Sequence, residues 1–367
     1  MSELFTFPVC DIRSMLRGLD DVEGLSRVDS GNMLGAVNRF PDYLAESAHA
    51  ARVEAGNLRA YQSVVLVGIG GSGSAADVLS EWLGPRAKIP FFVVRDSILP
   101  KFVGRDSLVV AISYSGETWE TLDVFRRAGR RGCALAGVGS GGRLAELCGG
   151  ARAPFVRVPQ NILPRAALGP MVGAGAVLLE SFGIAKGVRA SLQEAGRELG
   201  RLRSMVRAEV PSSRNQAKRL ALGLHGRMPV VYSLQRMSSV ARRAKNQFAE
   251  NSKVVAKYDL LPEAGHNEIV AWQGRNTGMV PVLVRDMGES KEEKAVIEAF
   301  KTALVTVARG KPLEVRTRAT SELGRLLGPI LCFDYVSVYL ACLMGVDPTR
   351  TEGIQQYRRF FSLRMRG

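Results

Sequence analysis

Two short segments combine glycines with hydroxyl side chains in a pattern that suits an anion. The first is VGIGGSGS (67–74) and the second is SYSGET (113–118). Each follows an apolar, β-branched run and precedes a segment of helical pattern. Backbone N–H groups at the start of a helix favour negative charge, and hydroxyl groups add hydrogen-bond donors. A terminal phosphate monoester is the ligand that this pair of loops would fit.

The first segment also fits two other interpretations. Gly68, Gly70 and Gly73 satisfy the spacing G-x-G-x-x-G after a predicted strand, and Asp96 could be the acidic residue expected about twenty positions later in a dinucleotide-binding protein. Serine and threonine are also favoured N-caps of helices, which would make the hydroxyl groups structural. Loops at the carboxyl ends of parallel strands share one crevice, so the second loop favours phosphate, with a dehydrogenase left open.

A second polar concentration, at 246–272, holds the candidates for acid–base chemistry. Glu250 lies at the end of a predicted helix, and His266, one of three histidines in the chain, lies in a loop after it. A positioned carboxylate or imidazole can move a proton on a bound substrate. The ordinary alternatives are a solvated helix face for the glutamate and a surface or capping role for the histidine.

The elements that must position these residues alternate between strands and helices. Strands are predicted at 63–68, 91–94, 108–113, 133–139, 155–159, 229–234, 254–261 and 280–286. Helices are predicted at 75–82, 117–127, 237–251, 289–308, 328–345 and 351–363, with a mainly helical stretch at 165–225. This alternation is typical of an α/β fold with parallel sheets covered by helices on both faces.

The length of 367 residues is about right for two domains with accessory segments. Two α/β halves are predicted on either side of a helical connection. The expected order is an N-terminal helical segment at 1–60, a first α/β domain at 61–160, the connection at 161–225, a second α/β domain at 226–345 and a C-terminal helix at 346–367.

Charge and composition narrow the class of protein. The formal net charge of +15 would suit a nucleic-acid partner, but the basic residues are spread along the chain without zinc-finger or RNA-recognition spacing. A basic enzyme for anionic metabolites is the preferred interpretation. The most apolar stretch, 329–345, carries Asp334 and is expected to be a buried helix rather than a membrane span. Five cysteines without a C-x-x-C pair, and no secretory signal, predict a cytoplasmic protein without a metal site.

Several segments together resemble the bifunctional phosphoglucose/phosphomannose isomerases, which are built from two sugar isomerase (SIS) domains. These segments are GIGGSG, SYSGET, PRAALG (164–169), AENSK with PEAGHNEI, and DPTRTEGIQQYRR. The resemblance runs from about residue 60 to the C-terminus. It implies two SIS-type doubly wound domains and an aldose–ketose isomerase that interconverts glucose 6-phosphate and mannose 6-phosphate with fructose 6-phosphate through a cis-enediolate. It also implies a homodimer and no cofactor.

The resemblance also implies roles for individual residues. Glu250 would move a proton between C1 and C2, and Arg165 would stabilise the enediolate. His266 would assist ring opening, in this superfamily often from the partner subunit. Arg358 stands where the family usually has lysine, and an arginine, which stays protonated, could only polarise. The implied substrate contacts are Gly71, Ser72, Ser113, Ser115, Thr118 and Thr351.

A non-catalytic regulator built on SIS domains would use the same loops. Such regulators usually carry a helix-turn-helix module, and residues 1–60 show no clear one. A sensor would also give no reason for Glu250 and His266. The isomerase is therefore the preferred hypothesis, ahead of the regulator and the dehydrogenase.

Overall fold

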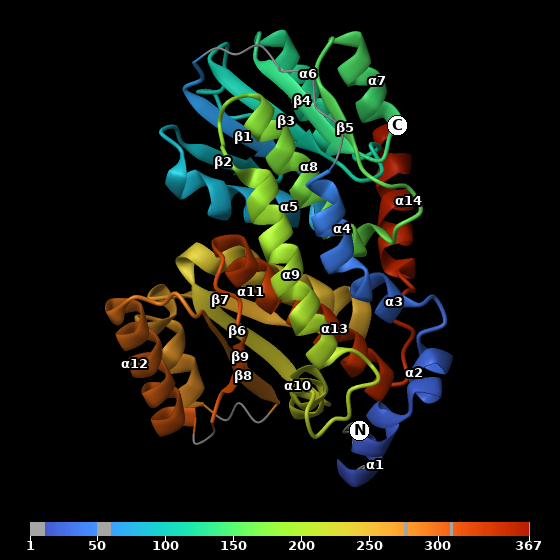
Figure 1. Ribbon diagram of the computed structural model, residues 1–367, viewed down its shortest axis with the longest axis vertical. Helices are drawn as coiled ribbons and strands as arrows, with labels where there is room; N and C mark the ends of the chain where they lie inside the picture. Colours follow the sequence, from blue (N-terminus) through green and yellow to red (C-terminus); the bar gives the residue numbers. More distant parts are fainter. Residues whose placement is uncertain (1–11, 50–59, 275–277, 309–310, 367) are drawn as a thin grey trace.

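The computed structural model describes residues 12–49, 60–274, 278–308 and 311–366, and it contains two parallel sheets, one above the other in Figure 1. The upper sheet has the order β2-β1-β3-β4-β5. Its strands are β1 (Ser63–Val67), β2 (Phe91–Val94), β3 (Ser107–Ile112), β4 (Ala134–Gly139) and β5 (Phe155–Arg157). The lower sheet has the order β7-β6-β8-β9, with β6 (Met228–Leu234), β7 (Lys257–Leu261), β8 (Met279–Arg285) and β9 (Leu313–Arg316).

Helices cover both faces of the upper sheet, which explains why every residue of β1 and β3 is buried. Alternate residues of these strands pack on opposite sides. Val64 and Leu66 join the cluster that includes α5 (Gly70–Leu83) and α8 (Leu168–Ser181). Val65 and Val67 pack in the cluster that includes α6 (Trp119–Arg130), while α7 (Gly142–Gly150) covers the same face further along.

The lower sheet is covered in the same way. Val231 and Val282 belong to the cluster that includes α10 (Gln216–Leu224), α11 (Ser238–Gln247) and α13 (Glu322–Leu343). Val230 and Leu283 face α12 (Lys291–Ala308) on the other side. Because α5, α8, α11 and α13 share one hydrophobic cluster, the two halves pack directly against each other.

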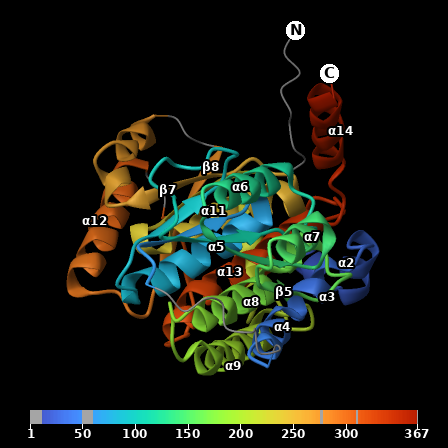
Figure 2. The same ribbon diagram turned by 90° about the horizontal axis from the view of Figure 1, so that it is seen from above.

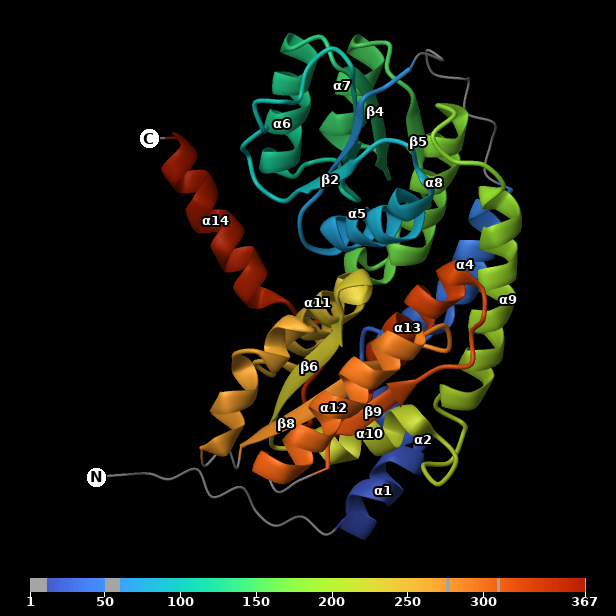
Figure 3. The same ribbon diagram turned by 90° about the vertical axis from the view of Figure 1, so that its left-hand side faces the viewer.

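Further helices tie the halves together along one side. The long helix α9 (Val188–Val206) spans both of them, and α4 (Phe40–Ser47) packs against it (Figures 1 and 3). The chain before α4 forms α1 (Ile12–Asp20), α2 (Val22–Val28) and α3 (Met33–Asn38). The last helix, α14 (Glu352–Arg366), projects on the outside of the molecule (Figures 2 and 3), and its Phe361 ring lies 5.7 Å from the ring of Trp119 at the start of α6.

Helix α13 is long and apolar enough to cross a membrane by length and composition, but 89% of its most apolar window is buried inside the protein. Asp334 lies within this helix and pairs with Arg243 of α11, with 2.8 Å between Arg243 Nη2 and Asp334 Oδ2. Both side chains are 3% exposed. The predicted buried helix is confirmed, and the structure adds that both halves pack around it.

The predicted α/β fold with two parallel sheets is confirmed. The predicted strands all occur, and β9 was not predicted. Helix α6 begins at Trp119 rather than at residue 117, and α13 begins at Glu322 rather than at 328. The predicted helix at 237–251 is α11 followed by a π-helical turn, Phe248–Ser252. Part of the predicted segment 1–60 lies outside the described residues, and the limits of the domains remain a prediction.

The buried ion pair generates a prediction about stability. Asp334→Asn leaves the Arg243 guanidinium buried without its counter-charge, which should lower the free energy of unfolding by about 3–5 kcal/mol in urea denaturation. The double variant Arg243→Met/Asp334→Leu removes both charges and should recover most of that loss. A loss below about 1 kcal/mol for Asp334→Asn would contradict this account of the pair.

Candidate active site

The first glycine-rich loop connects β1 to α5. Gly70 has a φ of +59°, and a Cβ at Gly68 would lie 2.9 Å from the backbone carbon of Ser72, so the turn is too tight for larger residues. Ser72 is buried, and its hydroxyl accepts a hydrogen bond from the backbone N–H of Tyr114 at 3.2 Å. The two predicted loops therefore lie against each other.

The second loop connects β3 to α6. Ser113 Oγ donates to Thr118 Oγ1 at 3.2 Å, and Ser115 Oγ accepts from the Glu117 N–H at 3.2 Å. Gly116 has a φ of +71°, and a Cβ there would overlap the carbonyl oxygen of Gly141. Only glycine fits this position without displacing backbone.

The capping interpretation of the hydroxyl groups fails at both helices. The N-cap residue of α5 is Ile69, and neither it nor Thr118, the N-cap of α6, makes a side-chain capping bond. Ser74 instead donates to the carbonyl of Gly70 at 3.3 Å. The first N–H groups of both helices thus lack a side-chain partner within the described structure, which favours an anion at this place.

A third glycine-rich loop, Ser140-Gly141-Gly142, follows β4 and was not predicted as part of the site. Ser140 Oγ donates to the Tyr114 carbonyl at 2.7 Å, and the Arg143 N–H donates to Glu117 Oε1 at 2.8 Å. These hydrogen bonds hold the second loop against the third. The run Ser140-Gly141-Gly142, directly after the strand predicted at 133–139, was the signal that could have found it.

Arg165 and Glu250 come together where the two halves meet. Arg165 lies in the short turn Pro164–Ala166, and its Nη1 is 3.8 Å from Glu250 Oε2. The first loop adjoins this turn, because a Cβ at Gly71 would lie 3.5 Å from the Pro164 carbonyl oxygen. The Arg165 side chain is 8% exposed and that of Glu250 is 27% exposed, so the carboxylate is the more accessible partner.

The π-helical turn sets the position of Glu250. Lys253, with a φ of +57°, ends the turn, and its Nζ donates to the carbonyls of Glu250 at 2.9 Å and of Asp347 at 2.7 Å. Asn251 is fully buried between Arg165 Nε, at 2.7 Å from its Oδ1, and Ser337 of α13, at 2.9 Å from its Nδ2. Such turns are rare in helices and occur often at functional sites.

The charges around Arg165 are balanced from several sides. Burial lowers the pKa of the Arg165 guanidinium, and the carboxylates of Glu250 and Asp347 oppose this shift. The guanidinium stays protonated at neutral pH because its ordinary pKa is far above 7. It donates through Nη2 to the Pro348 carbonyl, and its own backbone carbonyl accepts from Arg243 Nη2 at 2.8 Å. A fixed positive charge therefore stands beside the Glu250 carboxylate.

Three predicted residues do not join this cluster. His266 follows the turn Glu263–Gly265 after β7 and is exposed, and its side chain makes no hydrogen bond or ion pair with any described residue. Thr351 lies just before α14, three positions after the Pro348 that contacts Arg165. Arg358 is exposed on α14 and likewise has no polar partner in the described parts of the chain.

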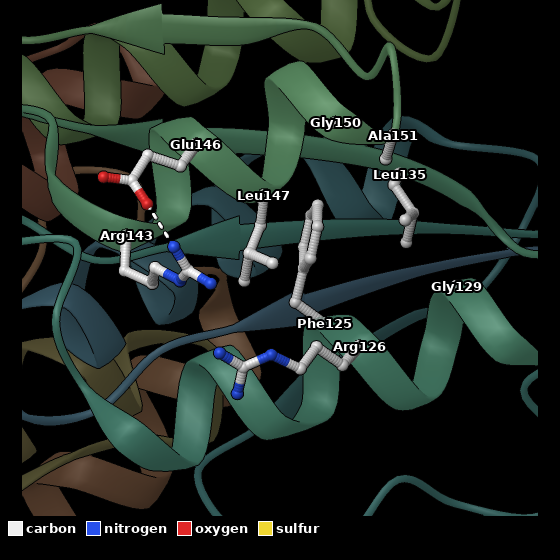
Figure 4. A pocket seen from close by; sticks show the side chains of 9 residues that line it. All are labelled: Phe125, Arg126, Gly129, Leu135, Arg143, Glu146, Leu147, Gly150 and Ala151. Carbon is white, nitrogen blue, oxygen red and sulfur yellow. Dashed lines mark hydrogen bonds and ion pairs between the residues drawn. The ribbon is translucent and has the colours of Figure 1, made fainter.

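Two hollows lie elsewhere on the first half. One, of about 330 Å³, lies between α6 and α7 and is lined by Phe125, Leu147, Arg126 and the Arg143–Glu146 ion pair (Figure 4). The other, of about 480 Å³, lies beside α4 and α8. No predicted site residue lines either one. Among the described residues, no group of three or more His, Cys, Asp or Glu side chains is placed to hold a metal ion.

Paired parallel sheets, with Ser/Thr loops at the strand ends and a carboxylate–guanidinium pair between the halves, define a protein of the SIS class. The SIS domain model matches residues 57–139. The model described as the bacterial phospho-glucose isomerase C-terminal SIS domain matches residues 213–360.

Relatives of this class align with most of the length of this chain. A bifunctional phosphoglucose/phosphomannose isomerase of Caldicellulosiruptor bescii is 31% identical over 88% of this chain and 96% of its own length. Another, from Aquifex aeolicus, is 34% identical over 82% of this chain and 91% of its own length. The chain therefore belongs to the bifunctional phosphoglucose/phosphomannose isomerase family, and it is an isomerase. The resemblance inferred from the motifs is confirmed, and the regulator is not favoured.

Solved structures share the fold at low sequence identity. A hypothetical protein from Thermus thermophilus has a TM-score of 0.66 at 17% identity, over 97% of this chain and 95% of that one. The C-terminal domain of glucosamine-fructose-6-phosphate aminotransferase from Francisella tularensis has a TM-score of 0.65 at 15% identity, over 86% of this chain and 96% of that one. At these sequence identities, the similarity to solved structures shows the fold alone.

The second loop generates a prediction about glycine. Gly116→Ala should lower the free energy of unfolding by about 1–3 kcal/mol, because alanine meets both a left-handed backbone and the Gly141 carbonyl. Gly104→Ala is the matched control, since an added Cβ there meets nothing within 4 Å, and its effect should stay within about 0.5 kcal/mol. Equal effects of the two variants in chemical denaturation would show that the loop is not so constrained.

Proposed function

We propose that this isomerase interconverts glucose 6-phosphate and mannose 6-phosphate with fructose 6-phosphate. The observation that carries the proposal is the Arg165–Glu250 pair, 3.8 Å apart, next to the first glycine-rich loop. A proton acceptor and a fixed cation thus lie beside a place suited to phosphate. The names of the relatives, which describe phosphoglucose/phosphomannose isomerases, support the same substrates.

The proposed reaction moves one proton between adjacent carbons of the open-chain sugar. The Glu250 carboxylate removes the proton from C2 of the aldose and returns it to C1, while the proton of the C2 hydroxyl moves to the oxygen on C1. The cis-enediolate between these steps carries negative charge on oxygen, which the Arg165 guanidinium stabilises. The same carboxylate serves both carbons because it is positioned beside them. Electrons stay within the sugar, and neither metal nor redox cofactor is part of this proposal.

The phosphate of the substrate is proposed to bind at the starts of α5 and α6. Both helix ends lack a side-chain cap, and hydroxyl groups surround them. The proposed contacts are Gly71, Ser72, Ser113, Ser115 and Thr118. Thr351 is proposed to contact the sugar near C2 and C3. Arg358, as a permanent cation, would polarise a sugar oxygen during ring opening without exchanging a proton.

The position of His266 supports a homodimer. The imidazole is exposed, makes no polar contact with a described residue and is accessible to a second copy of the chain. Helix α14 also presents exposed apolar side chains, with Tyr357 64% and Phe360 61% exposed, which a second copy would cover. We therefore propose that His266 of one subunit assists ring opening at the site of the other.

The wider setting follows from this activity. As part of the same proposal, the enzyme acts on hexose 6-phosphates in glycolysis and gluconeogenesis, in the cytoplasm. The proposal includes neither a nucleic acid nor a membrane as a partner, because small anionic substrates already account for the basic charge.

Glu250→Gln tests the proposed proton transfer. It keeps the shape of the side chain but removes the base, so kcat should fall by about a hundredfold or more with little change in KM. A coupled assay with each hexose 6-phosphate, run with a chelator present, measures this. Glu194→Gln, on the exposed face of α9, is the control and should match wild type. No wild-type turnover of either sugar would refute the substrate assignment, and an active Glu250→Gln would refute the base.

Mixing two inactive variants tests the shared site. In a heterodimer of Glu250→Gln with His266→Ala, one of the two sites would draw an intact glutamate from one subunit and an intact histidine from the other. After subunit exchange of an equal mixture, activity should return to roughly a quarter of the wild-type value. If both residues of a site come from one chain, the mixture stays as inactive as its components.

A further inference from the structure

The far end of α5 makes a contact that the proposed reaction does not use. Glu81, in the last turn of α5, accepts hydrogen bonds at Oε1 from Ser238 Oγ and from the Ser239 N–H, both at 2.7 Å. Its Oε2 accepts from Ser239 Oγ at 2.5 Å. The two serines form the first turn of α11, so this half-buried carboxylate joins the two halves of the molecule.

The carboxylate supplies what the start of α11 otherwise lacks. The N-cap residue of α11 is Met237, which makes no side-chain capping bond. The first N–H groups of a helix need acceptors, and the positive end of the helix dipole favours an anion. Glu81, from another part of the chain, provides both the acceptor and the negative charge. Its oxygens accept hydrogen bonds from the Ser239 N–H and from the hydroxyl groups of Ser238 and Ser239.

The start of α11 corresponds to the start of α5 in the sheet plan. Helix α5 follows β1, the second strand of the upper sheet, and α11 follows β6, the second strand of the lower sheet. Both helices begin with nearby serines, Ser72 and Ser74 in one case and Ser238 and Ser239 in the other. The upper helix start is the one proposed to bind substrate phosphate, whereas Glu81 fills the lower one.

The two helices run in opposite directions along the boundary between the halves, with α5 directly above α11 (Figures 1 and 3). The start of α5 adjoins the Arg165 turn, and the end of α11 leads into the turn that carries Glu250. The end of α5 holds the start of α11 through Glu81. A shift of α11 along α5 would therefore change the distance between the phosphate loop and Glu250.

Charged neighbours strengthen the same junction. Asp77, one turn before Glu81, pairs with Arg95 and lies 3.6 Å from Arg242 of α11. Arg95 Nη2 also donates to the Gly73 carbonyl of the first loop at 2.8 Å. Burial, with a smaller contribution from Asp77, raises the pKa of Glu81 to about 7. The ionised form of Glu81 is therefore increasingly favoured as the pH rises above 7.

We propose that Glu81 is a positioning residue for the isomerisation. Its carboxylate binds the start of α11 in the way that the substrate phosphate is proposed to bind the start of α5. This contact fixes α11, and with it Glu250, relative to the bound phosphate. This inference rests on the proposed function for its catalytic consequence. The contact itself belongs to the fold and is testable without activity.

Glu81→Ala and Glu81→Gln, assayed at pH 8, test the catalytic consequence. Removal of the carboxylate takes away the polar contacts at the start of α11, while the Arg243–Asp334 pair further along the helix remains. A displacement of about 1 Å can cost about a hundredfold in rate. Glu81→Ala should lower kcat by about tenfold to a hundredfold and leave KM within about threefold, because the phosphate loop is intact. Glu81→Gln keeps an acceptor for the Ser239 N–H and should lose less.

The matched control is Glu146→Ala, which breaks the exposed Arg143–Glu146 ion pair within the first half and should keep wild-type kcat (Figure 4). Hydrogen exchange at the first turn of α11 gives a readout that needs no substrate. Exchange should be clearly faster in Glu81→Ala, less so in Glu81→Gln, which keeps an acceptor for the Ser239 N–H, and unchanged in Glu146→Ala. If exchange is faster in the Glu81 variants but the wild-type protein turns over neither sugar, the contact between Glu81 and α11 is confirmed and the proposed function fails. Unchanged exchange, or wild-type kcat in Glu81→Ala, would overturn the inference.

Discussion

The buried ion pair between Arg243 and Asp334 is the interaction on which the arrangement of the site depends. Two charges removed from water must satisfy each other, and here Gln247 adds a further hydrogen bond to Asp334 Oδ1 at 2.8 Å. The same Arg243 donates to the Arg165 backbone carbonyl. One guanidinium thus links the core helix α13, the helix that leads to Glu250 and the turn that carries Arg165. A buried pair adds little net stability over apolar side chains of similar size, and we infer that its main effect here is to select one arrangement of these elements.

The remaining parts of the site divide between the two halves. The first half supplies the helix starts and hydroxyl groups proposed to hold phosphate, and the second supplies the turn with Glu250. Neither half has the complete site, so the chemistry requires a boundary that does not slip. The shared hydrophobic cluster closes this boundary without directional preference. The hydrogen bonds of Arg165, Arg243 and Glu81 fix how the two halves are placed relative to each other, because hydrogen bonds depend on distance and angle.

The fold was predictable because its signals are local. The run at 63–68 is continuous and β-branched since helices cover both faces of β1, and glycines mark the turn after it. Strand β9 escaped prediction because four residues, LEVR, carry no clear pattern. The beginning of α6 was misplaced by two residues because Thr118 looked like part of the first turn.

The site was less predictable from local pattern. Spacing along the chain gives no indication that Arg165 and Glu250 are neighbours. Glu250 was a candidate from its residue type and position, whereas only the family resemblance pointed to Arg165. The π-helical turn has no sequence signature that separates it from the end of an ordinary helix. Glu81 resembles any polar residue on a helix surface until the second half of the chain is packed against it. Contacts between halves depend on tertiary packing, which local sequence patterns do not specify.

The central claim is that a carboxylate moves the proton between C1 and C2. It is tested most directly by running the wild-type reaction in deuterated water and following the products by NMR. The account predicts deuterium at C1 of the fructose 6-phosphate formed, because the Glu250 carboxylate is partly open to solvent and exchanges its proton during some turnovers. Complete conversion with no deuterium on carbon, as a direct hydride shift would give, would contradict it.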